Sequence, residues 1–204
     1  MFKQMFKRRR NKKTDYKQRL ALLKSGSSRV VVRRSLRYLH VQIVTYDEKG
    51  DKVVLEDTSK NLKKYGWLGN AGNITAAYLT GLLVGLKARK IGIGDAVLDI
   101  GLQMSVKGSS LYAVASGVKD AGISIPVGKD ILPGEDKISG RHISNYATIL
   151  KKENSEKYKK QFSSYIKAGM EPEKITENFS AVKKRIVDEL GKEPRVELTA
   201  GNEQ

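Results

Sequence analysis

The positive charge of this chain is concentrated in its first forty residues. This segment carries 14 of the 39 lysine and arginine residues, and Asp15 is its only acid. The remainder is close to balanced, with 13 basic and 11 acidic side chains in residues 41–150 and 12 and 10 in residues 151–204. So much like charge repels itself unless a polyanion neutralises it. The sequence therefore predicts a nucleic-acid partner, on which the N-terminal segment becomes ordered.

The composition narrows the possible functions. A chain of 204 residues can form one substantial core, and 39% of apolar residues with a mean hydropathy of −0.45 indicate a normal core with very polar extensions. The absence of cysteine excludes disulfides, thiolate zinc sites and thiol catalysis. With only His40 and His142, a histidine metal cluster is not expected either. We predict neither a metal nor a cofactor.

Nothing in the sequence indicates a membrane. Residues 1–10 lack the apolar stretch of a signal peptide. The most apolar run, residues 74–86, is shorter than the roughly 20 residues that span a bilayer. We expect a cytoplasmic protein without membrane contacts.

Residues 1–27 are predicted to form a basic RNA-binding arm. The core of the arm is the cationic run at residues 7–13. We expect no stable structure before Thr14 in the free chain. Thr14 is the expected cap of a short helix that ends at Gly26. Phe2, Phe6 and Tyr16 lie among the cations, and such rings can stack on unpaired bases.

Residues 28–150 are predicted to form an α/β core. Residues 29–34, 39–44 and 52–56 have the β-branched or alternating pattern of strands, and their short connections indicate an antiparallel meander. Asn73 can cap a helix that runs from residue 74 to about residue 90. This crossover helix leads to a fourth strand at residues 96–100, and a second helix follows between Ser109 and Gly122. We expect irregular structure in residues 123–150.

Residues 151–204 are predicted to form a C-terminal helical extension with a polar tail. One helix places Tyr158, Phe162, Tyr165 and Ile166 on a single face and stops at Gly169. Pro172 opens a second helix, and the tail begins after residue 191.

Arginine alone supplies the positive charge between Arg29 and Arg37. A guanidinium makes forked contacts with phosphate, and no acid lies nearby in the sequence to pair with these side chains. We therefore favour a phosphate-binding strand over a solvated strand face. Trp67 lies in a glycine- and asparagine-rich loop, where packing on the core is favoured over stacking on RNA.

The glycine motifs do not indicate a nucleotide site. Gly92 and Gly94 lack the third glycine of a dinucleotide fingerprint, and Gly128 lacks the spacing of a P-loop. Gly81 and Gly85 are explained by close packing of their helix on the sheet. No small-molecule substrate is expected.

The alternative of a nuclease depends on carboxylates. Asp47, Asp57 and Asp99 fall near strand ends, where a ribonuclease H-like sheet holds metal-binding acids. The first strand offers Arg33 and Arg34 in place of an acid, and these cations would repel Mg²⁺. We predict no catalytic residue, and interpret Asp99 as a capping or hydrogen-bonding residue.

Several ordered segments resemble one known family over about residues 1–190. The chain resembles the archaeal and eukaryotic-type large-subunit ribosomal protein that binds 5S rRNA, the eighteenth in the bacterial naming. The segments are residues 12–20 (KKTDYKQRL), 29–33 (RVVVR), 65–67 (YGW), 76–81 (AAYLTG), 98–101 (LDIG), 120–122 (DAG) with 125–126 (IP), and 140–143 (GRHI).

The resemblance implies a ribonuclease H-like mixed sheet without catalytic acids, and a non-enzymatic ribosomal protein. Its implied role is to bind 5S rRNA and attach it to the large-subunit rRNA in the central protuberance, beside neighbouring large-subunit proteins. The residues implied as RNA contacts are Arg8, Arg9, Arg10, Lys12, Lys13, Tyr16, Lys17, Arg19, Arg33, Arg34 and Arg37, with Trp67, Asn73 and Lys107 as weaker candidates. The alternatives are a ribonuclease H-like nuclease or RNA-processing enzyme, and a non-specific RNA chaperone.

Overall fold

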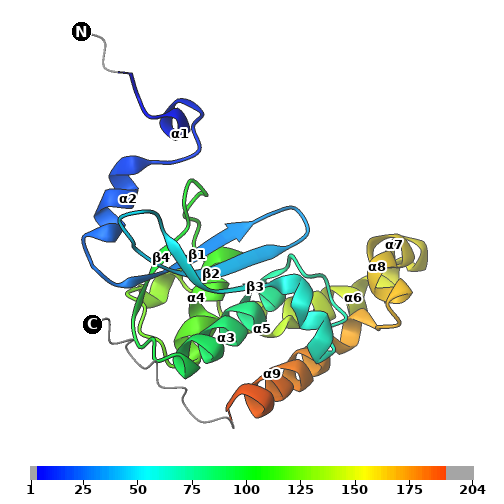
Figure 1. The fold of residues 1–204 in the computed structure, drawn as a ribbon. Helices are drawn as coiled ribbons and strands as arrows, with labels where there is room; N and C mark the ends of the chain where they lie inside the picture. Colours follow the sequence, from blue (N-terminus) through cyan, green and yellow to red (C-terminus); the bar gives the residue numbers. More distant parts are fainter. Residues whose placement is uncertain (1–3, 192–204) are drawn as a thin grey trace.

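A four-stranded mixed sheet forms the centre of the molecule. The computed structural model describes residues 4–191 (Figure 1). The strands are β1 (Ser28–Arg34), β2 (Leu39–Thr45), β3 (Lys52–Thr58) and β4 (Ala96–Asp99), in the spatial order β3-β2-β1-β4. The first three pair antiparallel, and β4 joins β1 in parallel after the crossover. This confirms the predicted α/β fold, with its meander, crossover helix and fourth strand.

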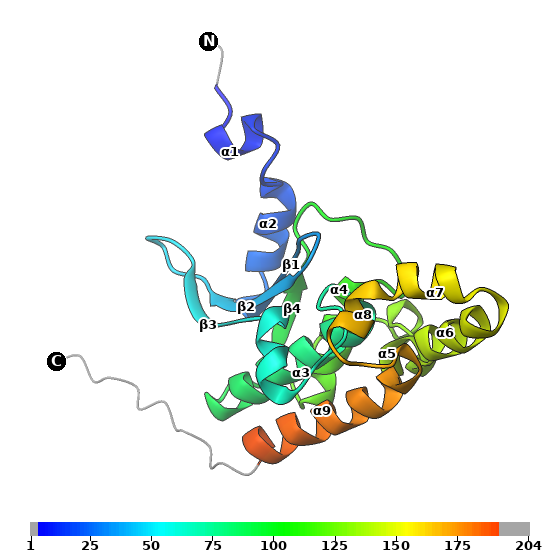
Figure 2. The ribbon, with the colours of Figure 1, turned by 90° about the vertical axis from the view of Figure 1, so that its right-hand side faces the viewer.

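One face of the sheet is covered by two helices. Alternate residues of β1 and β2, among them Val30, Val32 and Ile43, are fully buried against α3 (Ile74–Lys90) and α4 (Ser110–Asp120). Asn73 caps α3 as predicted, because its side-chain oxygen accepts a hydrogen bond from the Ala76 amide at 2.7 Å. Figures 1 and 2 show α3 and α4 on one side of the sheet and the N-terminal arm on the other. The second face therefore remains for the arm and its partner.

Helices α3 and α4 approach each other at backbone distance. A methyl group added to Gly81 would overlap the carbonyl oxygen of Val114, and one added to Gly117 would overlap that of Tyr78. A methyl group added to Gly85 would overlap the Cβ of Ala121 and crowd the backbone of Val118. Our expectation that Gly81 and Gly85 pack on the sheet is therefore wrong, since they pack on α4. The Tyr78 hydroxyl donates to Asp120 Oδ2 at 2.6 Å across this contact, and burial together with this bond raises the pKa of Tyr78.

The expectation of irregular structure in residues 123–150 is wrong. The region holds a short 3-10 helix (Lys129–Ile131), then α5 (Glu135–Ser139) and α6 (Arg141–Glu153). Gly140 separates α5 from α6 with a φ of +79°, a conformation that glycine adopts without steric cost. In α6, Ala147 and Leu150 are buried, with Ile143 packed partly against the core. The glycines and prolines of the region had concealed this helical spacing.

The C-terminal helices share the hydrophobic core of the sheet domain. The predicted first helix is divided at Phe162 into α7 (Ser155–Gln161) and α8 (Ser163–Lys167). Pro172 begins a 3-10 turn (Pro172–Lys174) that continues as α9 (Ile175–Gly191), close to the prediction. The ring of Phe179 on α9 lies 5.7 Å from that of Tyr78 on α3. The predicted polar tail lies outside the described residues. Within residues 4–191, no helix is long and apolar enough to cross a membrane.

Because α3 and α4 are in close contact, we predict that one methyl group added between them lowers the stability of the fold. We expect Gly117→Ala to destabilise the protein by about 1–3 kcal/mol, because overpacking outweighs the better helix propensity of alanine. Urea unfolding measures this change in free energy. The matched control is Gly94→Ala, since Gly94 has open space around it. It should change stability by less than about 0.5 kcal/mol. Equal stability of both variants would contradict the close contact.

Candidate nucleic-acid interface

The arm consists of two helices joined by a tight turn. They are α1 (Lys7–Arg10), a single turn, and α2 (Tyr16–Leu23). Asp15 caps α2, because its Oδ1 accepts hydrogen bonds from the amides of Lys17 at 2.9 Å and Gln18 at 3.2 Å. The prediction of Thr14 as the cap is wrong, since the Thr14 hydroxyl instead accepts from Arg8 Nε at 2.9 Å.

Helix α1 also corrects the expectation that no structure precedes Thr14. Besides the bond between Arg8 and Thr14, the ring of Phe6 lies 5.1 Å from that of Tyr16. Both contacts close the turn between α1 and α2. Two of the aromatic residues predicted to stack on bases therefore contact each other in a tilted arrangement, and the third, Phe2, lies outside the described residues.

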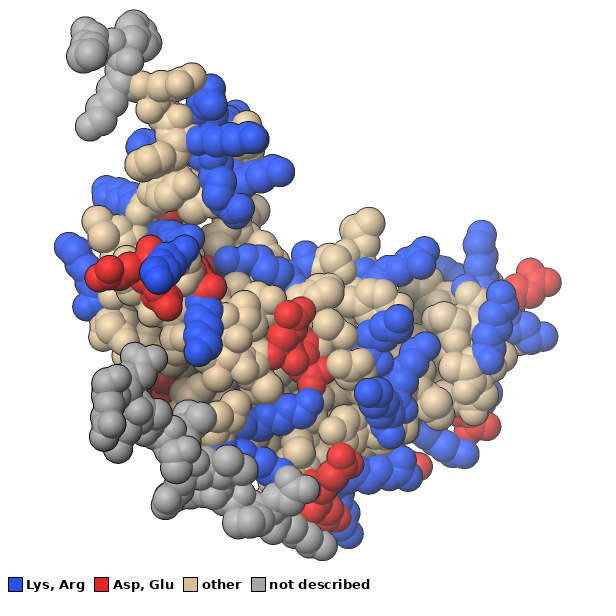
Figure 3. All heavy atoms as spheres, viewed as in Figure 1, with Lys and Arg blue, Asp and Glu red and all other residues tan. Residues whose placement is uncertain are grey.

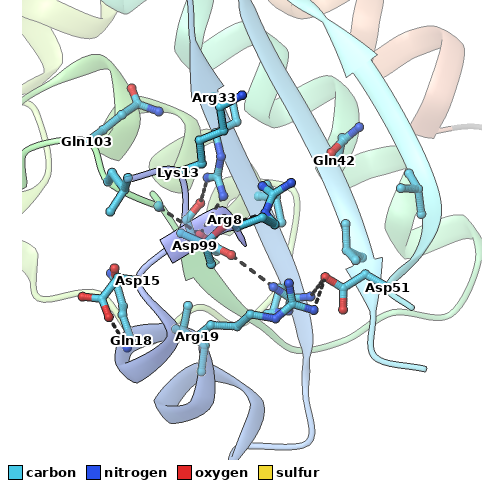
Figure 4. A pocket seen from close by; sticks show the side chains of 18 of the residues that line it. Arg8, Lys13, Asp15, Gln18, Arg19, Arg33, Gln42, Asp51, Asp99 and Gln103 are labelled. Atoms are coloured by element: carbon cyan, nitrogen blue, oxygen red, sulfur yellow. Dashed lines mark hydrogen bonds and ion pairs between the residues drawn. The ribbon is translucent and has the colours of Figure 1, made fainter. Parts of the chain in front are cut away.

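A chain of ion pairs connects the arm to the open face of the sheet. Arg19 on α2 lies 3.0 Å from Asp51 at the start of β3, and Asp51 Oδ2 also lies 2.7 Å from Arg29 Nη2 on β1. The second contact is close but poorly directed for a hydrogen bond, so its attraction is mainly electrostatic. Figure 4 shows Asp51 facing Arg19. One carboxylate thus links three segments that are distant in the sequence.

The chain of ion pairs continues to β4 through Asp99. Arg29 Nη1 donates to Asp99 Oδ2 at 3.2 Å, and Arg33 Nη2 donates to Asp99 Oδ1 at 3.1 Å. Arg33 also donates to the backbone oxygens of Val32 and Asp99, each at 2.8 Å. Asp99 accepts further from the Gly101 amide, which confirms it as a hydrogen-bonding residue. We call Arg19, Asp51, Arg29, Asp99 and Arg33 the arginine–aspartate network.

This network corrects the view that the strand arginines have no acid to pair with. The side chain of Arg29 is only 4% exposed and lies between two carboxylates, so Arg29 is structural. Arg33 is half-exposed, with its fork partly used by Asp99. Arg34, which is exposed, has no ion pair within residues 4–191. The tertiary structure therefore ranks three neighbouring arginines that the sequence presents as equivalent.

A hollow of about 540 Å³ lies between the arm and the open sheet face. Five of the predicted RNA contacts line it, together with residues that the sequence did not indicate. The five are Arg8, Lys13, Arg19, Arg33 and Arg34, and the additional ones include Gln18, Leu22, Val31, Gln42, Val44, Val53 and Gln103 (Figure 4). The alternation of β1 and β2 was a usable signal for Val31, Gln42 and Val44. No local pattern indicates Gln18 or Gln103.

Other predicted contacts lie outside this hollow. Arg9, Arg10, Lys12 and Lys17 are exposed on the arm, where Figure 3 shows lysine and arginine side chains gathered above the sheet. Lys107 is exposed in the loop after β4. Tyr16 is half-buried against Phe6, and Asn73 is used as the cap of α3. These residues are thus spread over the arm and two separate loops.

Arg37 and Trp67 meet at a second hollow, of about 510 Å³, between the β1–β2 hairpin, the Trp67 loop and α8. Trp67 is 2% exposed, and its Nε1 donates to the Asn70 backbone oxygen at 3.3 Å. Asn178 on α9 holds the same loop, donating to the Gly66 oxygen at 3.0 Å. A buried ring cannot stack on a base, so the inclusion of Trp67 among the RNA contacts is corrected.

The carboxylates of the nuclease alternative are separated and engaged. Asp57 lies 2.6 Å from Lys87 Nζ and accepts from Asn61 at 2.6 Å, while Asp99 serves Arg29 and Arg33. Asp47 is exposed in the β2–β3 turn, where it accepts from the Lys49 amide. Within the described residues, no three histidine or acidic side chains gather as a possible metal site.

The N-terminal half of the chain matches a protein family. The family described as ribosomal large subunit proteins 60S L5 and 50S L18 covers residues 1–94, which extend from the arm through α3 to the turn before β4. Apart from β4 and the loop that follows it, the matched range contains every segment that lines the arm hollow. This finding confirms the resemblance predicted from the sequence.

The arginine–aspartate network predicts that Asp99 stabilises the fold. In Asp99→Asn, the buried guanidinium of Arg29 loses one of its two carboxylates, and we expect a cost of about 3 kcal/mol in the free energy of unfolding. Urea denaturation provides the measurement. The matched control is Asp136→Asn, which removes the exposed pair with Arg141 and should cost less than about 1 kcal/mol. Equal losses in the two variants would show that the network is not stabilising.

Proposed function

We propose that this chain binds 5S rRNA as a structural component of the large subunit, because residues 1–94 match the family of ribosomal large subunit proteins 60S L5 and 50S L18. In this role it helps to attach 5S rRNA to the large-subunit rRNA in the central protuberance. Its further partners are neighbouring large-subunit proteins, and its place is the cytoplasmic ribosome. The family supports the structural role in the large subunit, and 5S rRNA as the target is our proposal.

The observation that carries the proposal is the set of cations left without acidic partners on the arm and the adjacent strand end. The exposed cations of this set have no ion pair among residues 4–191. They are Lys7, Arg8, Arg9, Arg10, Lys12, Lys13, Lys17, Arg34 and Arg37. Cations that neutralise phosphates release condensed counterions, which favours binding. A folded RNA supplies the required density of phosphates along one surface.

The geometry supports a division of labour among these cations. Phosphates along the arm would be neutralised by α1 and the turn after it, while the guanidinium of Arg34 offers a fork at the edge of the sheet. The arginine–aspartate network fixes the angle of the arm, so that both groups can contact one RNA at the same time. We propose Arg8, Arg9, Arg10, Lys12, Lys13, Lys17, Arg34 and Arg37 as the main contacts, with Arg19 and Arg33 sharing their charge between RNA and acids.

We also propose a division of the chain by role. Residues 1–27 form the RNA-binding arm, residues 28–150 the α/β core, and residues 151–204 a C-terminal extension. The packing of Phe179 against Tyr78 supports an extension that is rigidly attached to the core.

Neutralisation of phosphates by α1 predicts a change in salt dependence. Combining Arg8→Gln, Arg9→Gln and Arg10→Gln should weaken binding and make the slope of log K against log [KCl] less negative by about 2 to 3. Fluorescence anisotropy with labelled 5S rRNA measures both quantities. Lys184→Gln on α9 is the control, and an unchanged slope in the triple variant would argue against the arm as an electrostatic contact.

The ranking of the strand arginines gives a second prediction. Arg34→Ala should reduce affinity for 5S rRNA without changing the urea midpoint, because Arg34 has no acidic partner within the described residues. Arg33→Ala should reduce both, since it also removes the bonds to Asp99. The opposite pattern of stabilities would reverse our assignment of the two residues.

Specificity and turnover separate this proposal from its alternatives. We expect tighter binding to 5S rRNA than to an unrelated transcript of equal length, and intact RNA after incubation with Mg²⁺. A non-specific chaperone would bind both transcripts equally, and a nuclease would produce fragments that a denaturing gel resolves.

A further inference from the structure

The arm hollow changes in character with depth. Its outer cations, Arg8, Lys13 and Arg34, are exposed and free of ion pairs within residues 4–191. Its deepest charged groups, Arg29 and Asp99, are 3% and 7% exposed and neutralise each other. The free positive charge therefore lies at the rim, while the inside has little net charge to offer a ligand.

The floor of the hollow is apolar. Val31 on β1 and Val44 on β2 are buried and lie diagonally across the strand pair, since Val31 pairs with Gln42 and Val44 with Arg29. Val53 lies opposite Val44 on β3 with 47% of its surface exposed. Leu22 of α2 lines the hollow from the side of the arm. These four side chains do not belong to the main hydrophobic core. They form a small apolar surface between the arm and the sheet.

Amide side chains surround this floor. Gln42 donates to Glu56 at 3.0 Å and Gln103 donates to the Val32 oxygen at 3.2 Å, which leaves the amide oxygen of each as an acceptor. The side-chain amide of Gln18 makes no hydrogen bond in the part of the chain that the structure describes. Neutral donors and acceptors beside an apolar floor are suited to the edge and face of a nucleobase.

We propose that this hollow binds one unpaired nucleotide of 5S rRNA, with its base inside and its flanking phosphates on the rim cations. The inference rests on the proposed function and deepens it by assigning a pocket for a base. A volume of about 540 Å³ lies within the range of small-ligand pockets, roughly 300–1,000 Å³. The cations placed for the phosphates are Arg8, Lys13 and Arg34.

Charge decides between a base and a phosphate as the occupant. A phosphate on the floor would lose its hydration in exchange for contacts with valine side chains. It would also be repelled by the nearby carboxylates of Asp51 and Asp99. A base carries no charge, and its ring replaces water on Val53 and Leu22, the floor side chains that are not buried. The same nucleotide keeps its phosphates outside, where the unpaired cations are. The hollow therefore matches a nucleotide whose base points into the hollow and whose phosphates remain at the rim.

Filling the hollow tests the proposal without removing a charge. In the full-length chain, Val53→Phe places a ring at the floor, and we expect the Kd for 5S rRNA to rise about tenfold with an unchanged salt slope. The control is Val187→Phe on α9, since Val187 is 41% exposed and remote from the hollow. It should leave affinity unchanged. Circular dichroism melts confirm that both variants are folded.

Chemical probing of 5S rRNA provides a second measurement that does not depend on a variant folding. One unpaired nucleotide should become protected at its base in the wild-type complex, and Val53→Phe should restore its reactivity. Protection of backbone positions alone, or a changed salt slope in Val53→Phe, would show that the hollow takes phosphate and would overturn the inference. Tight, 5S-selective binding with no protected base would also overturn it and leave the proposed function intact. Equal binding to an unrelated transcript would refute the proposed function itself.

Discussion

A buried guanidinium determines how the two functional parts of this protein meet. Arg29 lies near the start of β1 and is enclosed by Asp51, which directly precedes β3, and by Asp99 at the end of β4. Removing a charge of this kind from water is costly, and it is tolerated only where carboxylates compensate it. Because Asp51 also holds Arg19, the same compensation that stabilises the sheet fixes the arm above it.

The network also decides which cations are available to RNA. Asp51 and Asp99 pair with Arg29 and Arg33, and within the described residues they form no ion pair with the exposed cations of the arm that lack acidic partners. The result is a separation between internal cations, which hold the fold together, and external cations such as Arg34, which can bind phosphate. A count of basic residues would assign the same role to all of them. The charge that remains for a polyanion lies on the arm and at the edge of the sheet.

The opposite face of the sheet explains why the RNA-facing side can remain open. Helices α3 and α4 approach closely at Gly81 and Gly117, so that one face supplies nearly all of the hydrophobic core. The C-terminal helices extend this core and do not cover the second face (Figures 1 and 2). On α9, Asn178 donates to the Gly66 oxygen and accepts from the Leu68 amide, on the two sides of Trp67, and Arg185 donates to the Tyr65 oxygen. These bonds hold the loop against α9. The sheet thus has one structural face and one face for binding.

The sequence alone determined the α/β architecture, the basic arm and the resemblance to the ribosomal family, because each depends on local pattern. Runs of β-branched and apolar residues indicated β1 and β3, alternation indicated β2, a capping asparagine indicated the start of α3, and charge density indicated the arm. The tertiary structure decided what depends on contacts distant in the sequence. Asp99 is 70 residues from Arg29, so no local pattern could reveal that this arginine is structural. Likewise the packing of Gly81 on α4 and the hollow beneath the arm arise only when separate segments come together, whereas the burial of Trp67 on the core agrees with the packing that its loop favoured.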